Sequence, residues 1–130
     1  MSMYADLDVW LALLKNDDWL SDRAERLLDE HEGELEVSLA TFIELFLVEE
    51  RFAFDRERAV TAILELATYD GDPDVVYQAS EHIDEGLTTF DAFHAALSGG
   101  RIVSSDGAYD CLGGVQRVRL EPDESEDAAG

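Results

Sequence analysis

Residues 86–110 read GLTTFDAFHAALSGGRIVSSDGAYD, and this stretch decides the fold class. Thr88 or Thr89 suits the N-cap of a helix that continues through Leu97, and two glycines then end it. Residues 101–104, which follow at once, predict a short strand. Short strands that alternate with helices along a chain are typical of α/β proteins, in which the strands pair in parallel.

The rest of the chain alternates between strands and helices in the same way. Further strands are predicted at residues 3–6, 35–38 and 115–120. Helices are predicted at residues 9–16, 18–31, 39–54, 55–68, 73–85 and 88–97, with a short turn or helix at 106–112. We expect one α/β domain over residues 1–120, with helices on both faces of a parallel sheet. Residues 121–130 hold five acids and no large apolar side chain, which predicts a disordered acidic tail.

The composition is strongly acidic. Thirty-one acids face nine bases in 130 residues, for a formal net charge of -22, and Lys15 is the only lysine. An acidic shell almost without lysine is typical of a halophilic archaeon with molar cytoplasmic salt; an acidic protein from low salt is the alternative. At about 1 M salt the Debye length is only about 3 Å, so the acidity does not exclude a polyanionic partner.

Other features bound the class of protein. The sequence has no apolar run of the roughly 20 residues that a membrane span needs, and no basic-then-apolar leader precedes the first predicted strand. Cys111 is the only cysteine, so no intrachain disulfide can form. We therefore expect a cytoplasmic protein that does not bind a membrane.

Four carboxylates stand at unusual places. Asp6 and Asp106 follow strands that are expected to be neighbours, and ligands bind at the carboxyl ends of parallel strands. Glu44 lies within an apolar helix, Asp91 lies early in another, and both helices are expected to start at the same edge. Each acid also has a local explanation: a polar helix seam for Glu44, a capping box with Thr88 for Asp91, and an Asp-Gly turn for Asp106.

If the four carboxylates converge, a cation must relieve their repulsion. Grouped acids repel one another and their pKa values rise, unless a divalent ion neutralises them. Mg²⁺ and Mn²⁺ are hard ions that take oxygen ligands and keep bound waters. Such a centre suits metal-assisted hydrolysis of phosphodiesters, in which the ion activates water and no protein nucleophile is needed.

Four segments occur in an order that resembles a known family. They are YADLDVWLALL (residues 4–14), VSLATFIELFLV (37–48), GLTTFDAFHAAL (86–97) and IVSSDGAYD (102–110). Each is weak alone, but DAFHAA followed by IVSSD is fairly specific, and all four in order are a strong signal. The chain resembles the PIN domain over nearly its whole length, and within that family the VapC-type toxins of toxin–antitoxin pairs.

The resemblance implies a three-layer α/β sandwich with a central parallel sheet of about five strands. It also implies a ribonuclease that uses Mg²⁺ or Mn²⁺, an RNA substrate, a cognate antitoxin and a homodimer. The implied catalytic and metal-binding residues are Asp6, Glu44, Asp91 and Asp106. Three further residues are supporting candidates: Ser104, whose hydroxyl matches a Thr/Ser position of the family; Asp8, where the family usually has Asn; and Asp110, a possible auxiliary ligand.

Two other functions remain open at this point. ADLDVW, residues 5–10, also fits the Asp-x-Asp start of haloacid-dehalogenase-type phosphatases, in which the first Asp is the nucleophile. That family needs a later lysine, and Lys15 is too close to Asp6 to serve. The other possibility is a PIN-like module without activity that binds RNA or a protein.

Overall fold

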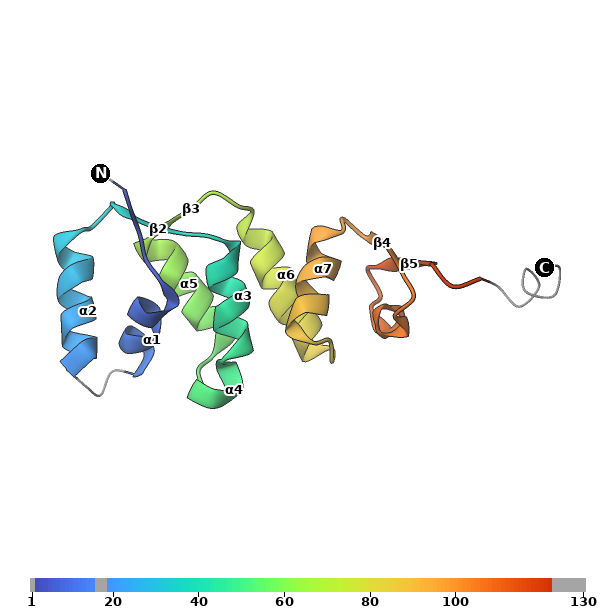
Figure 1. Cartoon of the computed structure of the whole chain (residues 1–130), viewed down its shortest axis with the longest axis horizontal. Coiled ribbons are helices and arrows are strands. Elements are labelled where there is room, and N and C mark those ends of the chain that lie inside the picture. The colour runs from blue at the N-terminus through green and yellow to red at the C-terminus, as the bar shows by residue number, and fades with distance from the viewer. Residues whose placement is uncertain (1, 16–18, 123–130) are drawn as a thin grey trace.

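The computed structural model describes residues 2–15 and 19–122, and these residues form a mixed α/β structure. Figure 1 shows the elements spread along one long axis, from α2 at one end to β4 and β5 at the other. The helices are α1 (Leu7–Lys15), α2 (Trp19–Glu30), α3 (Leu39–Leu47), α4 (Glu49–Phe52), α5 (Arg56–Leu66), α6 (Pro73–Asp84) and α7 (Thr89–Leu97), with a 3-10 helix η1 (Gly107–Cys111). The strands are β1 (Met3–Tyr4), β2 (Leu35–Val37), β3 (Thr68–Tyr69), β4 (Arg101–Ser104) and β5 (Gln116–Arg119).

The described strands all pair in parallel, as predicted, but they form two sheets. One sheet has the order β1-β2-β3 and the other contains β4 and β5. Met3 lies opposite Leu35 in the first sheet, and Val103 lies opposite Val118 in the second. The expectation that β1 and β4 are neighbours is therefore wrong for the described chain: β4 takes its only strand partner from β5, which follows it through one short helix.

The element boundaries agree closely with the sequence, with two exceptions. The helix expected over residues 39–54 is divided at Val48 into α3 and α4, and Ala53 then adopts a left-handed conformation with φ 50°. β3 was not expected, because its two residues lie between a helix and a turn and show no alternation. The start of the second helix at Asp18 and residues 123–130 of the expected tail lie outside the described residues.

The core is formed where α1, α3, α5, α6 and α7 meet. Its largest fully buried side chains are Trp10, Phe42, Leu45, Val60 and Val76. α7 packs against α6 and α3, and the Phe46 and Phe93 rings contact each other with centroids 5.3 Å apart. Within residues 2–15 and 19–122, no helix has both the length and the apolar character that crossing a bilayer requires.

Candidate functional site

Tyr109 is linked to two of the predicted site residues, Asp91 and Asp106. The Tyr109 hydroxyl donates a hydrogen bond to Asp91 Oδ1 at 3.2 Å. Asp106 acts on the same phenol, because its charge contributes to raising the pKa of Tyr109. Tyr109 itself is buried against the core. A site formed by α7, the end of β4 and η1 therefore contains two carboxylates and a buried tyrosine.

Local sequence explains why Tyr109 reaches Asp91. Asp106 is the N-cap of η1, and its Oδ1 accepts a hydrogen bond from the Ala108 amide at 2.9 Å. The Asp106 amide in turn donates to Ser104 Oγ at 2.9 Å. These two bonds turn the chain sharply after β4 and aim the next residues at α7. The Asp-Gly turn is thus present, and Ser104 supports the Asp106 backbone.

The electrostatics of this site keep Tyr109 protonated. Burial raises its pKa most, followed by the charge and hydrogen bond of Asp91 and then by the charge of Asp106, to a value of about 12. A phenol with this pKa does not ionise near neutral pH. Tyr109 can therefore hold Asp91 in place as a constant hydrogen-bond donor.

Asp91 is held in a different way from the one expected. Thr88 is the N-cap of α7, but its side chain makes no capping hydrogen bond in the described structure. The carboxylate lies in the first turn of α7, where the helix dipole favours negative charge, and accepts its bond from Tyr109. The capping box, which was the local explanation considered for Asp91, is therefore absent in the described structure, and the group that orients Asp91 comes from a segment eighteen residues later.

Asp6 follows β1, as the sequence predicted, and directly precedes α1. Its Oδ1 accepts a hydrogen bond from the Leu7 amide at 2.8 Å, and its carbonyl accepts from Val9. Asp8 is exposed in the first turn of α1, where its charge suits the helix dipole. Both acids stand at the surface, so neither strand nor helix buries a charge here.

Glu44 is exposed on α3, away from the buried face formed by Phe42, Leu45 and Phe46. Thr41 was expected on a polar seam with Glu44, but it is buried and its hydroxyl contacts Tyr4 at 3.1 Å. Figure 1 also shows that α3 begins beside β2, whereas α7 begins at the opposite side of the helical layer. The expectation that both helices start at one edge is wrong.

Asp110 forms an ion pair with Arg117, a residue that the sequence analysis did not single out. Arg117 binds it through two hydrogen bonds, from Nε at 2.9 Å and Nη2 at 3.0 Å. The Arg117 hydrogen bond outweighs desolvation and lowers the pKa of Asp110. Arg117 also donates to the Ser104 carbonyl and to Glu121. We call these four residues the Arg117 clasp, and in it Asp110 holds the C-terminal segment together.

The described residues contain no group of three or more His, Cys, Asp or Glu side chains arranged to hold a metal ion. The four predicted acids therefore do not converge within one copy of the chain. The donor set at Asp91 and Asp106 nevertheless fits Mg²⁺, which proteins usually bind through one or two carboxylates, with waters and substrate phosphates completing the shell.

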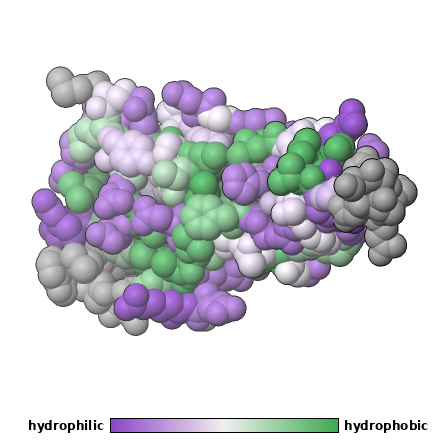
Figure 2. Space-filling model, turned by 45° about the vertical axis from the view of Figure 1, so that its right-hand side comes forward, coloured by the Kyte–Doolittle hydropathy of each residue, from purple (hydrophilic) through white to green (hydrophobic). Residues whose placement is uncertain are grey.

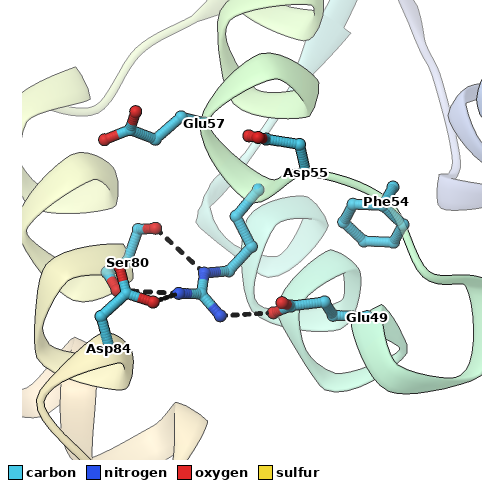
Figure 3. A pocket seen from close by; sticks show the side chains of 7 residues that line it. Glu49, Phe54, Asp55, Glu57, Ser80 and Asp84 are labelled. Atoms are coloured by element: carbon cyan, nitrogen blue, oxygen red, sulfur yellow. Dashed lines mark hydrogen bonds and ion pairs between the residues drawn. The ribbon is translucent and has the colours of Figure 1, made fainter.

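A second cluster surrounds Arg56, which lies in a cavity of about 330 Å³ between α4, α5 and α6 (Figure 3). The guanidinium donates to Glu49 at 2.6 Å, to Ser80 Oγ at 3.0 Å and to Asp84. Burial disfavours the charged guanidinium, but hydrogen bonds and charges from Glu49 and Asp84 outweigh burial and raise its pKa. Arg56 thus joins three helices, and its hydrogen-bonding groups are used within the chain.

Another cavity, of about 440 Å³, lies beyond the carboxyl ends of β2 and β3. Ligands of parallel sheets usually bind in this position. None of the predicted site residues lines it. The residues that line it are Val37, Ser38, Leu39, Tyr69, Asp70, Gly71, Asp72, Val75 and Leu97.

Comparisons with protein-family models, with curated proteins and with solved structures give no match for this chain.

Proposed function

We propose that this chain is a Mg²⁺- or Mn²⁺-dependent endoribonuclease of the PIN type, the VapC-like toxin of a toxin–antitoxin pair. The proposal rests on the four ordered sequence segments and on one observation. The buried Tyr109 donates a hydrogen bond to Asp91, and the charge of Asp106 contributes to raising its pKa. The two acids belong to the more specific pair of segments. We also propose that the protein is cytoplasmic, that it comes from a halophilic organism and that it has a cognate antitoxin.

The proposed fold is the PIN-like sandwich with one central five-stranded parallel sheet. What supports it is the presence of five strands in the described residues, all of them paired in parallel. In one copy these strands form sheets of three and two.

In the proposed reaction, Asp91 and Asp106 would hold the ion, whereas Asp6 and Glu44 do not converge on them within one copy of the chain. A bound Mg²⁺ would lower the pKa of a water molecule and offset negative charge on the phosphate. Tyr109 orients Asp91 and retains its own proton. Ser104 and the Ala108 amide hold Asp106. Cys111 is exposed, and its thiol donates to the Ala108 carbonyl.

The test combines cleavage with metal binding. Structured RNA is incubated with the purified chain in molar KCl, with and without Mn²⁺, and heat of binding is measured in the absence of RNA. We expect metal-dependent cleavage, and at least a hundredfold loss for Asp91→Asn and Asp106→Asn. Asp29→Asn is the matched control, because Asp29 is an exposed acid on α2, away from the site.

Two outcomes would contradict the proposal. If the chain and its Asp6→Asn variant both leave RNA intact in the presence of metal, the chain is not a nuclease of this kind. If RNA binds without cleavage and EDTA does not weaken binding, the chain is a binding module instead.

A further inference from the structure

The cavity beyond the carboxyl ends of β2 and β3 lies away from the candidate nuclease site. It is bounded by the start of α3, by the loop from β3 to α6 and by Leu97, the last residue of α7. Asp91 lies in the first turn of that same helix, at its other end. A cavity of about 440 Å³ is within the usual range of small-molecule sites, about 300–1,000 Å³.

Apolar side chains form part of the cavity wall. They are Val37, Leu39, Val75 and Leu97. Leu97 is 54% exposed, so an apolar group that enters the cavity would remove apolar surface from water, which is favourable. Figure 2 shows hydrophobic surface in the upper half of the molecule, the half in which Figure 1 places the β3–α6 loop and the end of α7.

Tyr69 gives the cavity a wall whose position is fixed by packing. Its ring packs edge-on against the buried Phe42, with centroids 5.1 Å apart. The Tyr69 hydroxyl lies so close to Gly71 that a β-carbon at position 71 would collide with it. The loop therefore follows this path past Tyr69 only with glycine at this position. A wall that is formed before a ligand arrives lowers the entropy cost of binding.

The charged side chains that line the cavity are both acids. Asp70 and Asp72 are exposed, and no lysine, arginine or histidine stands among the lining residues. Asp72 caps α6, and its Oδ1 accepts a hydrogen bond from the Asp74 amide at 2.9 Å. The Asp70 carboxylate makes no hydrogen bond or ion pair with any residue in 2–15 and 19–122. Burial raises the pKa of Tyr69 and the charge of Asp72 raises it further, so the phenol stays uncharged near neutral pH.

The Arg56 cavity shows how this chain neutralises a pair of acids at a cavity. There a guanidinium from the chain itself binds both Glu49 and Asp84 (Figure 3). The cavity at β2 and β3 has two acids but no cation of its own in its lining. The comparison favours a cation from outside the chain, and the apolar walls favour one that is carried on an apolar body. An anion would be repelled, and an inorganic cation would leave the apolar walls in contact with water.

We propose that this cavity binds a small organic cation, an amidinium, guanidinium or ammonium group on an apolar body. The charged group lies at Asp70 and Asp72, and the apolar body packs against Val75 and Leu97. The proposal does not depend on the nuclease function, because none of the four predicted acids lines the cavity.

Binding of benzamidine, an aromatic amidinium, tests the proposal. The ¹⁵N-labelled chain is titrated in about 1 M KCl, where screening suppresses the general attraction of cations to an acidic chain. The dissociation constant is measured from the amide shifts of Gly71, Asp72 and Val75. Benzamide has the same ring without the charge, and benzoate carries the opposite charge. We expect benzamidine to bind about tenfold more tightly than benzamide, the approximate factor for a hydrogen bond to a charged group, and benzoate not to shift these amides. Equal binding of benzamidine and benzamide, shifts spread over the whole acidic surface, or no binding overturns the proposal.

Surface variants locate the two parts of the ligand. Asp70→Asn should weaken benzamidine binding roughly tenfold and leave benzamide binding unchanged, because only the charged contact is lost. Leu97→Ser should weaken binding of both compounds equally. Asp74→Asn is the matched control, because Asp74 is an exposed acid in the first turn of α6 that does not line the cavity. Thermal unfolding checks that each variant is folded. Wild-type affinity in Asp70→Asn or in Leu97→Ser, or equal losses in Asp70→Asn and Asp74→Asn, overturns the proposal.

Discussion

Tyr109, in the middle of the 3-10 helix that Asp106 caps, donates the hydrogen of its hydroxyl to Asp91 Oδ1 at 3.2 Å. The contact joins α7 to the turn after β4, two parts of the chain that the sequence predicted to share a site. A phenol in this position orients a carboxylate without neutralising it.

Replacing Tyr109 by Phe removes the hydroxyl and keeps the ring. The free energy of unfolding should fall by about 1 kcal/mol, because a typical buried hydrogen bond contributes this much and Asp91 loses its donor. Urea denaturation in molar KCl measures the change. Tyr77→Phe is the matched control, since its hydroxyl contacts Thr61 at the surface. Equal losses for the two variants would contradict the importance of the Tyr109 contact.

The ionisation of Tyr109 should also affect how the free energy of unfolding depends on pH. The pKa of Tyr109 is about 12 in the folded chain against an ordinary value of 10.0. Because the folded pKa is raised, the contribution of Tyr109 is complete below about pH 10 and is lost as the pH rises to about 12. Near-ultraviolet titration should show one late tyrosinate that Tyr109→Phe removes. Tyr69, whose pKa burial also raises, remains in the variant. An unchanged late phase in Tyr109→Phe would contradict the assignment.

Arg117→Lys should loosen the C-terminal segment. A lysine cannot make the paired bonds that Arg117 makes to Asp110 while also reaching the Ser104 carbonyl. We expect faster hydrogen exchange in β4, η1 and β5, with α5 and α6 unchanged. Arg119→Lys is the control, because Arg119 is exposed and approaches Glu121 only at 3.7 Å. Equal exchange in the two variants would show that the Arg117 clasp does not hold the segment.

Arg56→Ala should destabilise the contact between α4, α5 and α6. The guanidinium binds Glu49, Ser80 and Asp84 at once, so its loss leaves several acceptors without a donor. We expect a loss of about 1–2 kcal/mol, since Asp84 still reaches water. Thermal unfolding of Arg58→Ala, an exposed neighbour, should be close to wild type. A stable Arg56→Ala variant would contradict a structural role.

Salt should stabilise the chain. With a net charge of -22, self-repulsion opposes the compact state, and screening removes most of it as the Debye length falls to about 3 Å at about 1 M. The denaturation midpoint should rise steadily with KCl. Choline chloride at equal ionic strength separates screening from specific K⁺ binding. A midpoint that is highest at low salt would contradict the halophilic interpretation.

The fold was predictable where the pattern is local. β4 occupies the predicted residues, because an apolar run directly after two glycines has few other interpretations. The break at Val48 was not predictable from an apolar pattern that continues through it. At the site, the contact of Tyr109 with Asp91 and that of Arg117 with Asp110 were not expected. A tyrosine and an arginine become partners of distant acids only through tertiary packing, which no spacing in the chain encodes.

The cap at Asp106 has a consequence for how genetic results on this chain should be interpreted. Asp106 Oδ1 accepts the hydrogen bond that forms the turn before Tyr109. Asp106→Ala would therefore remove both the charge and the turn that places the Tyr109 hydroxyl beside Asp91. An asparagine would retain the turn, because its amide oxygen can accept the same amide proton. A difference in activity between Asp106→Ala and Asp106→Asn would then measure the effect of the turn separately from the effect of the charge.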